Sequence, residues 1–61
     1  MAEMGDTIRI DYMEGEPQYG GKVGEIEFID GIGQLHGSWG GLAVVPGVDS
    51  FTILKKRMNN V

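Results

Sequence analysis

Cysteine is absent from this 61-residue chain, and histidine occurs once. Without cysteine no disulfide or thiolate chemistry is available, and a single histidine excludes a multi-histidine zinc site. No stretch approaches the roughly 18 consecutive apolar residues that a membrane helix needs. The first residues, MAEMGD, lack the apolar region of a signal peptide. We therefore expect a cytoplasmic protein that forms one domain over residues 1–61 and has no membrane association.

Basic residues are scarce outside the C-terminal end of the chain. The formal net charge is −4, and only two of the five basic side chains lie in residues 1–54, beside all nine acidic ones. Because binding to phosphate backbones depends on Lys and Arg, this acidic body disfavours nucleic acid. The remaining bases, Lys55, Lys56 and Arg57, form a candidate basic patch. They lie on a segment, residues 55–61, that we expect to be a solvated, flexible tail.

Glycine, in contrast, is abundant, and its eleven occurrences divide the chain into short runs without a helical period. The runs predicted as strands are TIRIDY, KVGEIEFID, QLHGSW, LAVV and FTIL. Asp30-Gly31 and Gly40-Gly41 predict tight turns. Pro46 begins PGVDS, which predicts a short 3₁₀ turn before the last strand.

This layout predicts an all-β fold, a small five-stranded SH3-like barrel with its ordered core at about residues 5–54. In the second run, Ile26 and Phe28 alternate with glutamates, which predicts one buried and one acidic face. Val23 and Ile29 fall out of phase with that pair, so we expect a bulge or bend, for which Gly24 is the natural position.

No arrangement of residues in the sequence predicts catalysis, a metal site or a cofactor. His36 and Ser38 are two residues apart on one strand, and such neighbours do not form a catalytic triad. Asp11, Glu14 and Glu16 offer oxygen ligands but lack the spacing of a calcium-binding loop. No helix follows the glycine clusters, so they do not predict a phosphate loop. We expect a protein that is not an enzyme and has no small-molecule ligand.

Several aromatic residues make peptide binding the open functional question. Tyr12, Tyr19 and Trp39 are the candidate partner-binding residues, because SH3 domains bind proline-rich ligands in an aromatic groove. The spacing differs from that groove, since Phe51 follows Pro46 by five residues rather than three. The alternative for Trp39 is that its ring covers the core at one end of the barrel. Its exposure distinguishes the two interpretations.

The segments GDTIRI, VGEIEFIDGIGQLHGSW and PGVDSF resemble a family of small uncharacterised bacterial proteins, known as domain of unknown function 4314. The resemblance covers about residues 5–54 and implies a small SH3-like barrel without an established activity. The segment between Trp39 and Pro46 is shorter than in that family, and the loop MEGEPQYGGK matches it poorly.

We therefore expect a non-enzymatic interaction module that binds an unidentified protein or peptide partner, or a second copy of itself. The alternative is a weak nucleic-acid-binding module that uses the basic C-terminal tail, because GDTIRI and GKVGEI also resemble the small barrel of KOW motifs. The negative charge of residues 1–54 favours the first hypothesis.

Overall fold

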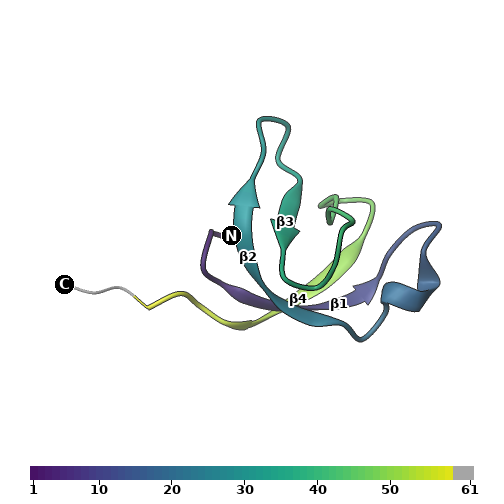
Figure 1. Ribbon diagram of the computed structural model, residues 1–61, viewed down its shortest axis with the longest axis horizontal. Helices are drawn as coiled ribbons and strands as arrows, with labels where there is room; N and C mark the ends of the chain where they lie inside the picture. Colours follow the sequence, from purple (N-terminus) through teal and green to yellow (C-terminus); the bar gives the residue numbers. More distant parts are fainter. Residues whose placement is uncertain (59–61) are drawn as a thin grey trace.

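The computed structural model describes residues 1–58, which form four strands and one short 3₁₀ helix (Figure 1). The elements are β1 (Thr7–Tyr12), η1 (Pro17–Tyr19), β2 (Val23–Ile29), β3 (Leu35–Gly37) and β4 (Ser50–Lys55). The strands form one antiparallel, open sheet in the order β3-β2-β1-β4. The prediction of an all-β fold is confirmed. Within the described residues, no helix has the length and apolar character needed to cross a membrane.

Strand β2 bends the sheet, because its two halves pair with different strands. Gly24 pairs with Ile8 of β1, whereas Ile26 pairs with Gly37 of β3. A Cβ atom on Gly24 would lie 2.7 Å from the backbone nitrogen of Trp39, and one on Gly37 would overlap the Trp39 ring. Gly24 therefore allows the backbone at Trp39 to approach the sheet, and Gly37 allows the indole to pack closely over it.

The core is formed by alternating residues of the strands together with residues from the connecting loops. Ile8 and Ile10 of β1 are completely buried, as their alternation in the sequence predicts. The other buried apolar residues are Met13, Ile26, Leu35, Trp39 and Val44.

The predicted fourth strand, residues 42–45, is not formed as a strand, so the sheet has four strands rather than five. Only Val44 pairs there, exchanging two backbone hydrogen bonds of 2.8 Å with Leu35. The Val45 N–H points away from β3 and donates to the Asp49 carboxylate at 2.8 Å. The next position whose N–H would face β3 is Pro46, which has none, so the pairing ends after a single bridge.

The 3₁₀ helix lies at Pro17–Tyr19, in the loop after β1, and not before the last strand as predicted. Pro17 has the fixed φ that suits the first position of such a turn. Residues 45–49 form a different turn, in which the N–H groups of Val48 and Asp49 both donate to the Val45 carbonyl. Gly47 has a φ of +90°, a left-handed conformation that does not continue a right-handed 3₁₀ helix.

The irregularity predicted at Gly24 lies instead between Ile26 and Phe28. These two residues pair with the adjacent positions Gly37 and His36, so β2 carries one extra residue there. The shift turns Phe28 outward, where it is 55% exposed and packs beside the His36 ring. The expectation that Phe28 is buried with Ile26 was wrong, because alternation along one strand does not reveal its register with the next.

Candidate functional site

A groove of about 290 Å³ lies between the loop after β1 and the segment that precedes β4. Its apolar lining residues are Met13, Leu42, Ala43, Val45 and Val48, and its acidic lining residues are Glu14, Glu16 and Asp49. We call this the loop groove. Leu42 is 41% exposed and Val48 is 58% exposed, so its apolar surface is accessible to water. No basic side chain lines it.

Asp49 joins the two walls of the loop groove. One carboxylate oxygen accepts the backbone N–H of Glu14 and the other accepts that of Val45, both at 2.8 Å. The Asp49 side chain is largely buried, with only 8% of the residue exposed. Met13, 3% exposed, anchors the first wall in the core. The separation of the walls is therefore fixed by one side chain and by packing.

Asp49 is not among the site residues expected from the sequence, although its position in the turn PGVDS carries a usable signal. An aspartate in a Pro-Gly turn often accepts backbone N–H groups nearby, which explains the bond to Val45. The bond to Glu14 spans 35 residues and has no local signature.

The three candidate partner-binding aromatics do not form a common surface. Trp39 is only 4% exposed, and its indole N–H donates to the Leu42 carbonyl at 2.8 Å. It is therefore a core residue, the second of the two interpretations of the sequence. Tyr19 is half-buried. Tyr12 is 48% exposed, and its hydroxyl lies 3.4 Å from the Glu14 carboxylate, which places it beside the loop groove.

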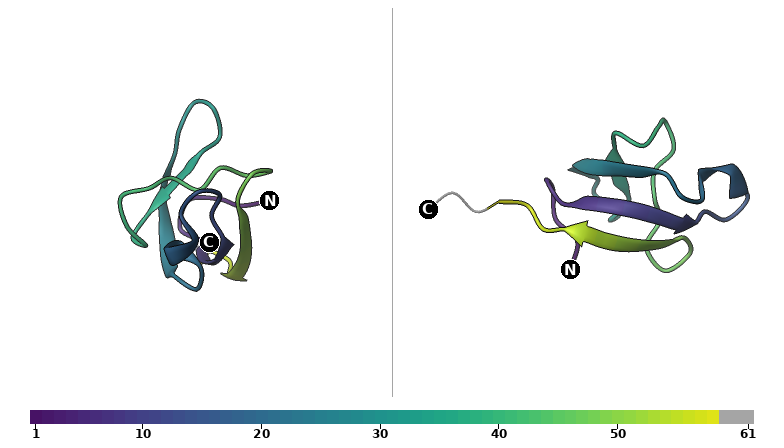
Figure 2. Two further views of the ribbon diagram at one scale, coloured as in Figure 1. Left: turned by 90° about the vertical axis from the view of Figure 1, so that its right-hand side faces the viewer. Right: turned by 90° about the horizontal axis from the view of Figure 1, so that it is seen from below.

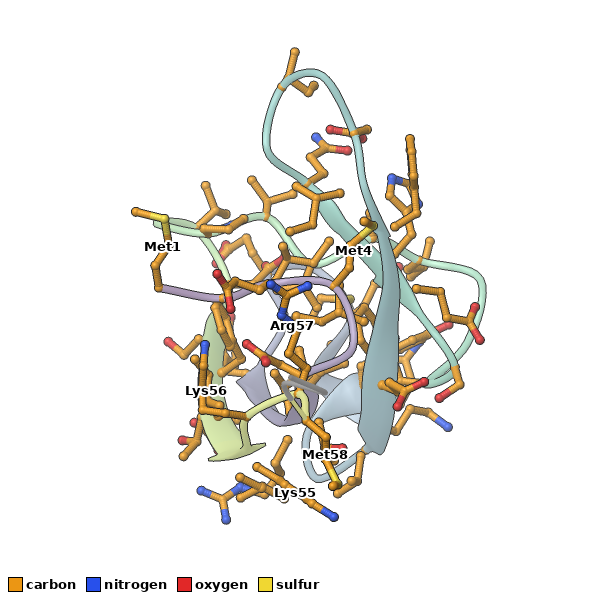
Figure 3. All side chains as sticks on the ribbon, turned by 90° about the vertical axis from the view of Figure 1, so that its left-hand side faces the viewer. Met1, Met4, Lys55, Lys56, Arg57 and Met58 are labelled. Carbon is orange, nitrogen blue, oxygen red and sulfur yellow. The ribbon has the colours of Figure 1, made fainter. Side chains whose placement is uncertain are left out.

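The predicted basic patch lies at the opposite end of the sheet, where the two ends of the described chain meet (Figure 3). Lys55 ends β4, one residue beyond the predicted core. The Lys56 ammonium lies 2.8 Å from the carboxylate of Asp6, which is completely buried, and 3.7 Å from that of Glu3. The backbone N–H of Arg57 donates to Asp6 at 2.7 Å, and its guanidinium lies 3.5 Å from Glu3.

These contacts change the acidity of Asp6 and use most of the charge of the patch. The hydrogen bond from Lys56, aided by the backbone N–H groups of Arg57 and Glu3, lowers the pKa of Asp6 to about 2 against the opposing effect of burial. The same pair raises the pKa of Lys56. Phosphate contacts through Lys56 or Arg57 would therefore compete with existing ion pairs. Residues 59–61 of the predicted tail lie outside the described residues.

The single histidine belongs to a structural hydrogen-bond network in the β2–β3 hairpin. One Asp30 oxygen accepts the backbone N–H groups of Ile32 and Gln34, and the other lies 2.8 Å from His36 Nε2. The His36 contact, followed by these backbone bonds, lowers the pKa of Asp30. Gly33 completes the turn with a φ of +85°. Within residues 1–58, no three acidic or histidine side chains lie close enough to hold a metal ion.

The fold and these contacts define a small antiparallel β domain with a single core and a groove between two of its loops. A family model described as "Domain of unknown function (DUF4314)" matches residues 3–54. The chain therefore belongs to this family, as the three sequence segments indicated. No curated protein and no solved structure matches the chain.

Proposed function

We propose that this protein is a non-enzymatic peptide-interaction module and that the loop groove is its binding site. The observation that carries the proposal is the combination, in one groove, of exposed apolar side chains with an acidic rim. Glu14 and Glu16 belong to one wall, and Leu42 and Val48 belong to the other. Because opposite charges align partners and apolar contacts supply affinity, the expected ligand is an extended segment with basic residues beside aliphatic ones.

We also propose that the open sheet is a reduced SH3-like barrel. The bridge between Val44 and Leu35 extends the observed order to Val44-β3-β2-β1-β4, in which Val44 takes the place of the strand predicted at residues 42–45. The loop groove is bounded by the loop after the first strand and the turn before the last. Those segments contribute to the peptide groove of SH3 domains. Here aliphatic side chains and Met13 replace the aromatic lining, which favours flexible aliphatic ligands over rigid proline-rich ones.

The proposal is tested by selecting binders from a library of displayed 12-residue peptides and measuring the affinity of the selected peptides by fluorescence polarisation. Peptides that combine Lys or Arg with Leu, Ile or Met are expected to be enriched. Val48→Lys removes an apolar contact and adds a positive charge to the groove, so it is expected to weaken binding at least about tenfold.

Val23→Lys is the matched control, because Val23 is similarly exposed, at 51%, but lies in β2 outside the groove. Val48 lies in an exposed turn, so Val48→Lys is expected to change stability by no more than about 0.5 kcal/mol. Val23→Lys faces Arg9 across β1 and β2, so a loss of up to about 1 kcal/mol is expected for the control. If the library yields no basic-aliphatic sequence, or if both variants weaken binding equally, the loop groove is not the binding site.

A further inference from the structure

Strand β4 forms an outer edge of the sheet (Figure 2). In the part of the chain that the structure describes, Ser50–Lys55 pairs with β1 alone. One side of its backbone therefore presents N–H and C=O groups that no other strand uses. Such an edge is a template for a further strand.

This edge lacks the features by which natural sheets usually prevent strand addition. Residues 50–54, SFTIL, contain no charge, proline or glycine, and Phe, Thr and Ile favour extended structure. The other outer strand, β3, is only three residues long and is partly covered by its bridge to Val44. Of the two outer strands, β4 is thus the longer and the less protected.

The residues of β4 are self-complementary when two copies run antiparallel. With a two-fold axis at Thr52, this residue faces Thr52 of the second copy, and Phe51 faces Ile53 of the second copy. Phe51 and Ile53 are both partly buried and pack against the core, so their pairing continues the apolar face across the interface. Ser50 and Leu54 pair on the opposite, exposed face.

The apolar pattern selects this register over the neighbouring one, because it keeps Phe51 opposite Ile53 of the second copy on the face that packs against the core. A register centred on Ile53 would place Lys55 opposite Phe51 instead. An apolar hollow of about 320 Å³ beside Phe51, lined in part by Ile29 and Pro46, offers room for side chains of an added strand.

We infer that two copies of this chain associate through β4 and form one continuous antiparallel sheet across a two-fold interface. The inference goes beyond the proposed function, because it concerns the edge of β4 and not the loop groove. Sedimentation equilibrium is expected to give a dimer, twice the 6.6 kDa mass of the chain, that dissociates on dilution.

Thr52→Lys places two positive charges across the axis and is expected to raise the dimer dissociation constant at least about tenfold. The Thr52 hydroxyl donates to Asp11 at 2.6 Å and accepts from Arg9 at 3.3 Å. The new ammonium therefore lies between a carboxylate and a guanidinium, and a loss of stability of up to about 1 kcal/mol is expected within each monomer. Val23→Lys, on a strand inside the sheet, is expected to leave the dimer unchanged. Circular dichroism verifies that both variants are folded.

Disulfide trapping tests the register of the two β4 strands. Because the chain has no cysteine of its own, any disulfide must form between the introduced residues. Thr52→Cys places two thiols on directly opposite residues, about 4.5–5.5 Å apart at Cβ, from which a small movement reaches disulfide geometry. Ser50→Cys separates them by four residues along the strand, about 13 Å, which is too far. Efficient oxidation of Thr52→Cys alone supports the interface.

Three results would overturn the inference: a wild-type monomer at all concentrations, equal dissociation constants for Thr52→Lys and Val23→Lys, or equal trapping of Thr52→Cys and Ser50→Cys. Peptide affinity of the loop groove is measured separately. Thr52→Lys is expected to retain it, so failure of the dimer and failure of the proposed peptide-binding function give different results.

Discussion

Removal of the Asp49 carboxylate is expected to separate the two walls of the loop groove. Asp49→Ala breaks both 2.8 Å hydrogen bonds and leaves the N–H groups of Glu14 and Val45 without their acceptor. A hydrogen bond to a charged group contributes about 1.5–3 kcal/mol, so the two together contribute about 3–6 kcal/mol. A domain of this size has a net stability of only about 3–5 kcal/mol. Asp49→Ala is therefore expected to be largely unfolded at 25 °C.

Asp49→Asn is expected to have an intermediate effect, because its amide keeps one acceptor oxygen but turns an NH₂ donor towards the other backbone N–H. The free energy of unfolding is expected to fall by about 1.5–3 kcal/mol. Urea unfolding, followed by the fluorescence of the buried Trp39, measures the free energy of unfolding of Asp49→Asn, and the same fluorescence without urea reports the unfolded fraction of Asp49→Ala. Ser50→Ala, at the adjacent exposed position, is the control and should change the free energy of unfolding by less than about 0.5 kcal/mol. A loss below about 1 kcal/mol for Asp49→Ala would refute the assigned role.

Three further predictions concern the core and the chain ends. Gly37→Ala should cost about 1–3 kcal/mol in urea unfolding, because its Cβ overlaps Trp39, whereas Gly41→Ala, which meets no atom within 4 Å, should be nearly neutral. Trp39→Phe removes the hydrogen bond to Leu42, which should lower the free energy of unfolding by about 0.5–1.5 kcal/mol. Circular dichroism should show a lower melting temperature for this variant. The pKa of Asp6 is about 2, against an ordinary 3.8. The contribution of the Asp6 carboxylate to stability is therefore complete well above pH 3.8 and is lost as the pH falls through 2. When the free energy of unfolding is measured against pH, Asp6→Asn should lack this loss at acid pH.

The features predicted correctly from the sequence depend on local rules. Ile8 and Ile10 alternate with polar residues, and the two-residue period of a strand places both in the core. The hairpin at Asp30 was predicted from its residue types, but its turn runs from Asp30 to Gln34 with the positive φ at Gly33, and not at Asp30-Gly31 as expected. The motif of this turn also carried the family resemblance. These features require no knowledge of distant contacts.

The features predicted wrongly or missed depend on contacts between distant segments. The sequence left the burial of Trp39 open, because this burial depends on the absence of a side chain at Gly37, which only the bent sheet brings against the indole. The loop groove likewise exists because Asp49 reaches Glu14 across the fold. The ion pairs at Lys56 were missed for the same reason, since Asp6 lies 50 residues away in the sequence.

The central claim is that the loop groove binds an extended basic-aliphatic peptide. Its most direct test is an amide NMR titration of ¹⁵N-labelled protein with a selected peptide and with a version in which Lys and Arg are replaced by Glu. The account predicts that the largest shifts occur in residues 13–16 and 42–49 and that the charge-reversed peptide causes none. Shifts confined to β2 or to residues 55–58, or equal shifts with both peptides, would contradict it.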